Sequence, residues 1–356
     1  MKPPHILIVG AGIVGASIAW HLVRAGASVS VFDANEPGGV ATRNSWGWIN
    51  ASWGNAEPYF RLRVHAMQEW RRLEQEVPDL SVDWAGSLLW ELPPDELRSF
   101  QADHAAWGYN VRLVERAGAR AIEPHLAVPP QLAVHAPEEG AVEPLAAAQA
   151  LLAAAQGYGA IIAANRPVGG LIFRGQRVIG AETHSGPLYA DEVVVASGVG
   201  TANLLATAGL SFPMRVSPAL LVRTRPHAKR LNGLIMSPVM QLRQIPDGRL
   251  IGAASIEDVG SDADGEQAAA AFDAMKDMLI AATSLVFESW VVGHRPIPGD
   301  GLPTVGRYPG VTGLYVAVTH SGVTLAPAIG RCVADELLTG KRDSLIKPYG
   351  VERFIC

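Results

Sequence analysis

The feature that most constrains the fold is the stretch VGAGIVGASIAW at residues 9–20. It follows a short apolar run, residues 6–9, that has the character of a strand buried on both of its faces. Gly10, Gly12 and Gly15 then stand at GxGxxG spacing. A glycine turn placed between a strand and a helix is typical of nucleotide-binding α/β proteins.

The residues after this turn extend the same pattern. An apolar helical period covers residues 13–25 and ends at Gly26, and a second strand, SVSVFDA, ends in Asp33. Asp33 stands 18 positions after Gly15, close to the spacing of the dinucleotide-binding fingerprint. We therefore predict a bound nucleotide here.

Each of these residues has a physical role in such a site. Gly10 permits the tight turn, Gly12 lets the backbone approach a pyrophosphate, and Gly15 lets the helix pack against the sheet. The helix start offers free N–H groups and a positive dipole end to the phosphates. Asp33 can accept both hydroxyl groups of a ribose. The stretch by itself leaves open whether the nucleotide is a shuttling nicotinamide or a resident flavin.

The first half of the chain then departs from plain α/β alternation. Residues 36–54 are rich in Gly, Asn, Ser and Thr, which predicts a loop with many hydrogen-bond donors. A helix is expected over 59–76, ended by Pro78, and short strands and helices are expected over 79–141. Residues 142–160 predict a further helix, closed by glycines.

The second half contains a further set of strands. Residues 177–198 predict a hairpin that returns to a buried strand at 193–196. Residues 216–299 predict an antiparallel region, with a hairpin around Asp247-Gly248 within 245–255. Residues 313–340 predict a strand, a turn and a helix that stops at Gly340.

This last segment favours a flavin over a nicotinamide. A nicotinamide enzyme usually completes its site within one contiguous doubly wound domain, whereas here a second strand-to-helix turn, residues 318–327, comes near the end of the chain. Pro327 is expected in the first turn of that helix, where a missing N–H donor costs nothing.

Composition narrows the class of protein. A chain of 356 residues suggests two domains, and a net charge of −5 with mixed signs gives no basic stripe for nucleic acid. The uncharged stretches 145–165 and 193–214 are broken by polar residues, glycine or proline, so no membrane span is expected. Two cysteines, Cys332 and Cys356, indicate no disulfide framework. Without a signal-peptide pattern at the start, we expect a cytoplasmic location. No metal-ligand spacing or GxSxG nucleophile motif occurs.

Taken in order, the segments resemble the D-amino-acid-oxidase family of FAD-dependent oxidoreductases, in its glycine oxidase and sarcosine oxidase branch. The resemblance is carried by GAGIVG with Asp33, ATRNSWG (41–47), the helix segment 142–160, ADEVVVASG (190–198), GHRPIPGDGLPTVG (293–306) and THSGVTLAPAIG (319–330). It implies an α/β fold in which a Rossmann-like FAD-binding domain of the GR2 type is interleaved with a smaller α+β substrate domain on an antiparallel sheet. The FAD-binding domain would comprise 1–78, 142–215 and 300–356. The substrate domain would comprise 79–141 and 216–299.

The resemblance also implies a set of cofactor-binding residues for a non-covalently bound FAD. The last helix would direct its N–H groups at the pyrimidine ring of the flavin, where negative charge gathers on reduction. The expected residues are Gly10, Gly12, Ile13, Val14, Gly15, Asp33, Ala34, Thr42, Arg43, Asn44, Ser45, Gly47, Trp48, Pro167, Val168, Ala196, Ser197, Gly198, Arg295, His320, Ser321, Gly322, Val323, Thr324 and Leu325.

On the substrate side, Arg295 stands where the glycine oxidase branch has the arginine that pairs with the substrate carboxylate. The planar guanidinium can bind a carboxylate through two parallel hydrogen bonds. This would hold the Cα–H of the substrate against flavin N5. The alternative is a structural arginine in a surface ion pair.

Three departures from the branch weaken a closer assignment. The segment HSG (320–322) has no arginine after the histidine. No tyrosine occurs in VMQLRQ (239–244), where Arg243 or Gln241 could substitute and an exposed strand arginine is the alternative. Leu250 stands near the place of the oxygen-activating lysine of sarcosine oxidases, which leaves oxidase and dehydrogenase both open.

His320, His294 and Trp48 complete the candidates. Either histidine could carry a proton, although a hydrogen-bonded structural role is favoured. Trp48 could line the substrate cavity or pack against the flavin or the core. The expected substrate is a small amino acid or N-substituted glycine, with O₂ or an electron-transfer protein as acceptor. A 2-hydroxy-acid dehydrogenase and a non-catalytic flavin-binding partner subunit are the alternatives, and the oligomeric state is not predicted.

Overall fold

The glycine turn lies at the carboxyl edge of a six-stranded sheet in the computed structural model of the chain, which describes residues 3–53, 55–255 and 263–355. All neighbouring strands of this sheet are parallel except the antiparallel pair β19–β20. In spatial order the strands are β19 (Thr304–Arg307), β20 (Leu314–Val318), β13 (Glu192–Val195), β1 (His5–Val9), β2 (Ser28–Phe32) and β9 (Ile161–Ala163). The expected parallel strands at 6–9 and 193–196 are thus present.

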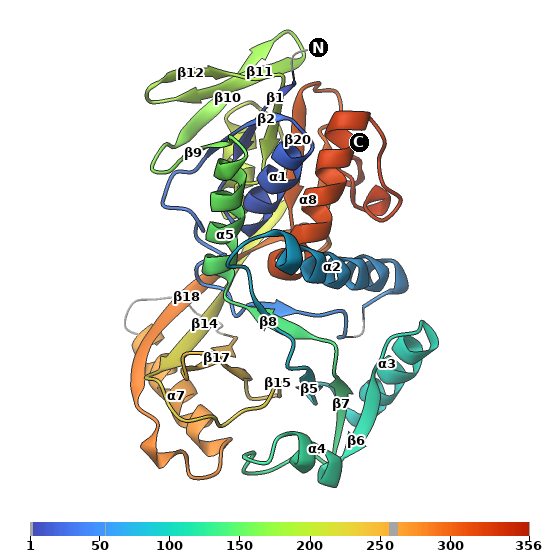
Figure 1. Ribbon diagram of the computed structural model, residues 1–356, viewed down its shortest axis with the longest axis vertical. Coiled ribbons are helices and arrows are strands. Elements are labelled where there is room, and N and C mark those ends of the chain that lie inside the picture. Colours follow the sequence, from blue (N-terminus) through green and yellow to red (C-terminus); the bar gives the residue numbers. More distant parts are fainter. Residues whose placement is uncertain (1–2, 54, 256–262, 356) are drawn as a thin grey trace.

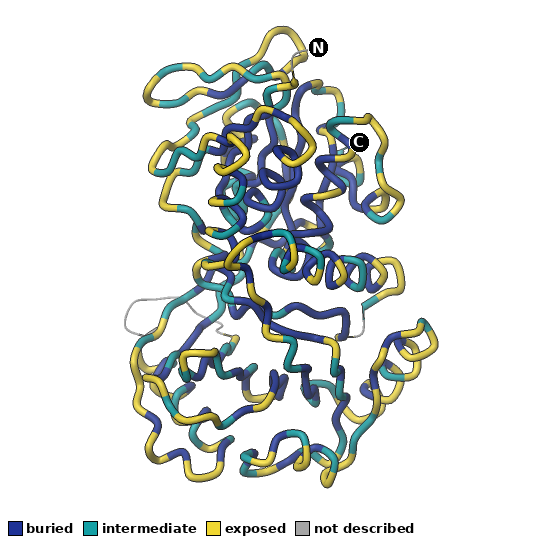
Figure 2. The backbone as a smooth tube through the Cα atoms, viewed as in Figure 1, coloured by how far each residue is buried: buried dark blue, intermediate teal, exposed yellow. Residues whose placement is uncertain are grey.

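Alternate residues of β1 face two different layers, because side chains of a strand point to opposite faces. Ile6 and Ile8 pack into the cluster that contains α1 (Ile13–Arg24), α5 (Pro144–Gly157) and α8 (Gly322–Thr339). Leu7 and Val9 pack into a second cluster, below the antiparallel strands β10 (Val168–Arg174), β11 (Arg177–Thr183) and β12 (Gly186–Tyr189) and the short helix α6 (Thr201–Ala206). Figure 2 shows that the buried backbone concentrates around α1 and α8.

A second, eight-stranded sheet lies apart from the first (Figure 1). In spatial order it contains β18 (Phe287–Pro298), β14 (Met214–Thr224), β17 (Leu250–Ala254), β16 (Gln241–Gln244), β15 (Leu234–Met236), β5 (Ser87–Leu89), β7 (Leu132–Ala136) and β6 (Arg112–Glu115). The expected hairpin around Asp247-Gly248 joins β16 to β17, while the pair β15–β5 is parallel.

Helix α7 (Ala263–Asp277) covers one face of this sheet and was not expected within 216–299. Its alanine-rich sequence carries only a weak apolar stripe, and burial of Ala268, Ala271 and Met275 against Leu242 and Leu250 fixes it in place. The short helices α3 (Pro94–Ala106) and α4 (Arg116–Ile122) complete the segment 79–141.

A small antiparallel sheet, β3 (Trp48–Ile49), β8 (Gly140–Val142) and β4 (Val82–Asp83), connects the two parts. It corrects two expectations. The loop 36–54 contains strand β3, and the helix expected over 142–160 begins only at Pro144, because the preceding residues pair with β3 and β4.

Helix ends differ slightly from the expected ones. Helix α1 ends at Arg24 rather than Ala25, and the strand before Asp33 ends at Phe32. Helix α2 (Glu57–Glu76) begins two residues before the expected Tyr59, because Pro58 is tolerated in the first turn of a helix.

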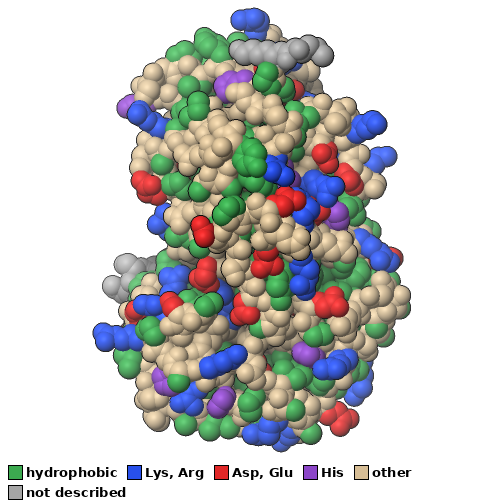
Figure 3. Space-filling model, in the orientation of Figure 1, with side chains coloured by type: hydrophobic (Ala, Val, Ile, Leu, Met, Phe, Trp, Pro, Cys, Tyr) green, Lys and Arg blue, Asp and Glu red, His purple; other side chains and the backbone are tan. Residues whose placement is uncertain are grey.

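Strands of the six-stranded sheet all fall within 1–78, 142–215 and 300–356, and β14 crosses the expected boundary at 215/216. The division into an FAD-binding and a substrate-binding domain stays a prediction. No helix of the described residues is long and apolar enough to cross a bilayer, and the cytoplasmic location also stays a prediction. Figure 3 shows acidic and basic side chains interspersed over the face in view.

Candidate active site

The turn between β1 and α1 has no room for a side chain at two of its three glycines. Gly10 has a φ of +113°, and a Cβ there would collide with the backbone of Ala196. A Cβ on Gly15 would collide with the carbonyl of Gly10. Gly12 is less crowded, because the nearest atom to an added Cβ is Thr42 Oγ1 at 3.2 Å. A ligand can therefore approach the backbone closely at Gly12 and not at the other two.

The first turn of α1 presents donors to this space. Ile13 N–H donates to Thr42 Oγ1 at 3.0 Å, while the N–H groups of Val14 and Gly15 belong to the helix start, where no intrahelical acceptor exists. The first turn carries no acidic residue. A diphosphate fits this arrangement, because it accepts hydrogen bonds and complements the positive end of the helix.

Asp33 directly follows β2, beside the same turn. Its Oδ2 accepts the Ala11 N–H at 2.7 Å, and its Oδ1 accepts the Asn35 N–H at 2.8 Å. A carboxylate with one donor on each oxygen keeps lone pairs for two ribose hydroxyls. Asp33 O also accepts the Arg166 N–H at 2.7 Å, which places Pro167 and Val168 beside Asp33 and Ala34.

The loop of residues 42–47 passes over the other side of the turn. Thr42 is buried and Arg43 is exposed. A Cβ on Gly293 of β18 would collide with the carbonyl of Asn44, so this loop packs directly on the strand that carries Arg295. Ser45 Oγ accepts the N–H of Gly47, which has a φ of +89°.

The two tryptophans of this region point to different partners. Trp46 is buried, and its Nε1 donates to Ile251 O at 3.1 Å. Trp48 donates its Nε1 to Glu139 Oε2 at 3.1 Å and packs edge-on against Trp46. Trp48 remains partly exposed, so packing in this cluster and contact with a ligand are compatible for it.

Residues 196–198 complete the carboxyl edge of the sheet. Ala196 packs on Gly10, Ser197 Oγ lies 3.1 Å from Thr201 Oγ1, and Gly198, with a φ of +54°, starts a short 3-10 helix. The structure thus brings the three expected segments at Gly10, Thr42 and Ser197 into one place.

Helix α8 starts at the same edge. Its N-cap residue, Ser321, makes no side-chain capping bond, and Leu325 N–H is bonded to Ser321 O at 3.0 Å. The N–H groups of residues 322–324 therefore have no intrahelical acceptor. The nearest atom to a Cβ added on Gly322 is Val14 Cγ2, at 3.6 Å. The starts of α1 and α8 are neighbours.

The expectation that Pro327 stands in the first turn of this helix is wrong. Helix α8 begins at Gly322, so Pro327 is its sixth residue and leaves the carbonyl of Val323 without its helical donor. The indole of Trp70, on α2, takes over this role. Its Nε1 lies 3.0 Å from Val323 O and 3.1 Å from Thr324 O.

Arg295 lies on β18 and is half-buried. Its Nη2 donates to Ser217 Oγ at 2.9 Å and to Pro218 O at 3.1 Å, and its Nε reaches Ser217 O at 3.5 Å. Burial, and then the charge of Arg215, lower the pKa of Arg295. Within residues 3–53, 55–255 and 263–355 it forms no ion pair. The alternative of an arginine in a surface ion pair therefore does not describe the structure.

His320 follows β20 and precedes the N-cap of α8. Its pKa is lowered to about 4, first by desolvation and then by the charges of Arg295, Arg63 and Arg215. The charges are the firmer cause, because the ring remains open to solvent. His320 is thus neutral near pH 7. His294 is half-buried on β18, in register with Pro218.

Arg243 differs from both of its expected alternatives. Its side chain is only 4 % exposed, so it is not an exposed strand arginine. Its Nη2 donates to Glu143 Oε1 at 2.6 Å, its guanidinium lies over Trp46, and burial lowers its pKa. It also lines a pocket of ≈ 380 Å³ together with the hairpin residues 244–248. Its Nε has no partner within the described part of the chain.

Two buried charged residues near this site were not expected from the sequence. Glu139 is fully buried and accepts hydrogen bonds from Trp48, Ser87, Tyr109 and the N–H groups of residues 51 and 52. Arg63 is 6 % exposed and contacts the N-cap Ser321 of α8. Arg63 occupies the apolar face of α2, in line with Phe60 and Met67, which is the signal that could have marked it.

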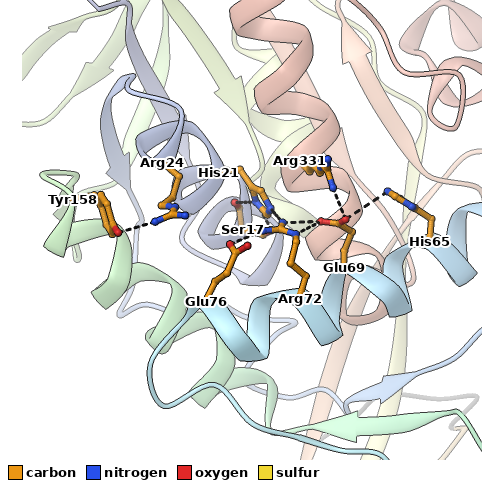
Figure 4. A network of polar contacts seen from close by, with 9 residues as sticks. All are labelled: Ser17, His21, Arg24, His65, Glu69, Arg72, Glu76, Tyr158 and Arg331. Carbon is orange, nitrogen blue, oxygen red and sulfur yellow. Dashed lines mark hydrogen bonds and ion pairs between the residues drawn. The ribbon is translucent and has the colours of Figure 1, made fainter.

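A network of polar contacts joins α2 to α1 and α8 behind the site (Figure 4). Glu69 accepts hydrogen bonds from Arg72 and Arg331, each at 2.7 Å at its closest, and Arg72 Nη2 lies 2.7 Å from His21 Nε2. His21 Nδ1 lies 2.8 Å from Ser17 O, so the ring is neutral with its proton on Nδ1. Burial opposes the ionisation of Glu69, but the two arginines outweigh it and lower its pKa.

These features define a dinucleotide-binding α/β oxidoreductase in which the start of a second helix meets the nucleotide turn. The donors of α1, the two free positions of Asp33 and the close approach at Gly12 fit the diphosphate and ribose of FAD. No group of three or more His, Cys, Asp or Glu side chains able to hold a metal occurs in the described segments.

Comparisons with known proteins give the family. The model of the family "FAD dependent oxidoreductase" (DAO) matches residues 5–336, so the chain belongs to this family. The resemblance to the D-amino-acid-oxidase family is confirmed, and FAD is its cofactor. The cofactor is held without a covalent bond: the described cysteine, Cys332, is buried in α8 and its thiol pKa is raised to about 12 by burial.

The chain is similar to the glycine oxidase of Pseudomonas aeruginosa, with 27% identity over 97% of each chain. It is also similar to a component polypeptide of the opine oxidase of Rhizobium meliloti, with 26% identity over 99% of this chain and 98% of the other. Among solved structures, the glycine oxidase of Geobacillus kaustophilus matches with a TM-score of 0.90 and 24% identity over the full length of both chains. The latter likeness confirms the expected fold.

Proposed function

We propose that the chain oxidises the Cα–N bond of a small amino acid or an N-substituted glycine and transfers the hydride to FAD. The observation that carries this proposal is the charge around His320. Arg295, Arg63 and Arg215 all act on this ring, and none of them forms an ion pair within the described residues. A group of unneutralised guanidinium ions suits a substrate that carries a carboxylate. The names of the glycine oxidase relatives support an amino acid in this place.

Bound FAD supplies the acceptor for the hydride that leaves the substrate Cα. Arg295 holds the carboxylate of the substrate, and its own hydrogen bonds to Ser217 and Pro218 of β14 hold Arg295. This orientation fixes the position of the Cα–H bond, which lowers the entropic part of the barrier. The neutral ring of His320 adds no charge beside the amine, which must itself be neutral to lose hydride. The product imine then reacts with water and needs no residue of the chain.

Two other functions make different predictions. The opine oxidase relative is named as one component of a larger enzyme, which favours a flavin-binding partner subunit as the second candidate. The neutral His320 could instead accept the hydroxyl proton of a 2-hydroxy acid, which is the third candidate.

One experiment separates these functions. The FAD-loaded protein is mixed without oxygen with glycine, N-methylglycine, larger amino acids, iminodiacetate, lactate and the decarboxylated amines, and flavin absorbance is followed. We expect bleaching by one or more of the carboxylate-bearing amines and none by the amines that lack the carboxylate. Bleaching by lactate alone would establish the hydroxy-acid activity. An inert flavin that becomes reducible only with a co-purified second polypeptide would establish the partner-subunit function.

The electron acceptor is tested in the same sample. Leu250 is fully buried and packs on the α7 side of the sheet, so its side chain does not face the loop that carries Trp46. Reoxidation of the reduced protein by dissolved O₂ and by an artificial dye, measured side by side, distinguishes an oxidase from a dehydrogenase.

A further inference from the structure

The guanidinium of Arg63 is a buried positive charge whose partners are all neutral. It donates to Asn50 O at 3.0 Å, Tyr59 Oη at 3.2 Å and Ser321 Oγ at 2.8 Å, and to Asn50 Oδ1. No carboxylate within the described residues forms an ion pair with it. Burying an ion without a counter-ion is costly, so the position of Arg63 calls for a compensating negative charge.

The nearest structural charge to Arg63 is also positive. Ser321 is the N-cap of α8, and the N–H groups that follow it form the positive end of the helix dipole. Asn50 N–H reaches Thr324 Oγ1 in the same turn at 3.4 Å, so Arg63 and the helix start belong to one network. A cation beside a helix N-terminus is unfavourable unless an anion occupies the site.

The buried carboxylate of Glu139 does not neutralise Arg63. It accepts the N–H groups of Ala51 and Ser52, which follow Asn50, and its other bonds come from Trp48, Ser87 and Tyr109. Glu139 therefore holds the backbone that carries Asn50 and forms no ion pair with Arg63.

We propose that Arg63 is a positioning and electrostatic residue for the cofactor, whose charge stabilises the negative charge of the reduced flavin and raises its reduction potential. The proposal rests on the FAD site described above, with the start of α8 facing the pyrimidine ring. It does not depend on which substrate the protein oxidises. A fixed charge in a poorly solvated place acts strongly on a neighbouring charge, because water screens it little.

The test compares two neutralised arginines on one helix. Arg63→Gln removes the buried charge, and Arg61→Gln removes the charge of a half-exposed arginine that pairs with Glu57. The reduction potential of bound FAD is measured with dithionite and a reference dye, and the affinity for sulfite, which adds to flavin N5 and leaves negative charge on the pyrimidine ring, is measured by titration.

For Arg63→Gln we expect the equilibrium between flavin and dye to shift at least tenfold toward oxidised flavin, about 30 mV for a two-electron couple. Sulfite should bind at least tenfold more weakly. Arg61→Gln should match the wild type in both measurements, and Arg63→Lys should recover part of the loss because it keeps the charge. An Arg63→Gln protein with a lower melting temperature and weaker FAD binding but unchanged potential and sulfite affinity would overturn the proposal.

A second pair of variants serves if Arg63→Gln does not fold. Ser321→Asp and Ser321→Asn are nearly equal in shape and both can cap α8, but only the first places a negative charge beside Arg63. We expect Ser321→Asp to have the lower potential and the weaker sulfite binding of the two. Equal values for this pair would also refute the role of Arg63, and a change confined to the binding of a carboxylate inhibitor would assign Arg63 to the substrate.

Discussion

Arg295→Ala is expected to reduce the efficiency of flavin reduction without releasing the flavin. In the structure Arg295 has no carboxylate partner among the described residues, and its pKa is lowered by burial and by Arg215. The incoming carboxylate of the substrate would provide the missing negative charge. Flavin binding should survive, because the expected FAD contacts come mainly from the turn at Gly12, the loop at Thr42 and the start of α8.

The magnitude follows from the burial of this pair. Breaking a buried charge-assisted pair costs about 2 to 5 kcal/mol. Arg295 is only half-buried, so the lower part of this range, about 2 to 3 kcal/mol, applies. At about 1.4 kcal/mol for each factor of ten, kcat/KM should fall about 30- to 200-fold.

Arg295→Lys tests the geometry of the pair. Nη2 and Nε of Arg295 are directed at Ser217 and Pro218 of β14, while Nη1 has no partner in the part of the chain that the structure describes. A single ammonium cannot be held by β14 and receive a carboxylate in the same way. The lysine variant should therefore lose most of the activity as well.

The assay is the rate of anaerobic flavin reduction against substrate concentration. Arg215→Ala is the matched control, because it removes the same charge from an exposed side chain near the same site, and it should change the rate only a few-fold. An Arg295→Ala protein that keeps its FAD and reduces it as efficiently as the wild type would refute the carboxylate role. Equal reduction by a decarboxylated amine would remove the carboxylate from the reaction.

Three further results are expected. Gly12→Val should be purified largely free of flavin, because its side chain would occupy the space beside Thr42; wild-type flavin content, measured by absorbance, would show that Gly12 serves packing alone. Acid precipitation should leave the yellow colour in the supernatant, since Cys332 is buried within α8; colour in the pellet would contradict this. His21 has a folded pKa of about 4, below its ordinary 6.5, because of burial. The unfolded chain therefore binds the proton first, and stability falls as the pH drops from about 6.5 toward 4. Between pH 7 and 5, urea unfolding should show that His21→Gln loses about 2 kcal/mol less than the wild type, and an equal loss in both proteins would refute the lowered pKa.

The elements with a strong local signal could be predicted from the sequence. The glycine turn, the acid at the end of β2 and the parallel strands follow from spacing and periodicity, because each depends on residues within about thirty positions. Helix α7 was missed since its alanine-rich sequence has little amphipathic pattern and is held by contacts to β14 and β17.

The charged residues of the site were harder to predict. Arg243 was expected on an exposed surface or at the substrate, yet it is buried between the loop at Trp46 and Glu143, a residue 100 positions earlier in the chain. Sequence spacing cannot reveal such a pair, because the two residues meet only in the folded chain. Glu139 depends in the same way on donors from three separate segments.

Helix α2 shows how one face of a helix can shape a site that no motif marks. Trp70 donates to the carbonyls of Val323 and Thr324, the first of which Pro327 deprives of its helical donor. Arg63 stands seven residues before Trp70, two turns away on the same face, and reaches the N-cap of the same helix. Trp70 therefore lets α8 keep a proline near its start, and Arg63 adds positive charge where the free N–H groups lie. Because both side chains occupy positions that an apolar stripe would normally fill, we infer that this face of α2 is adapted to the start of α8 as well as to the core.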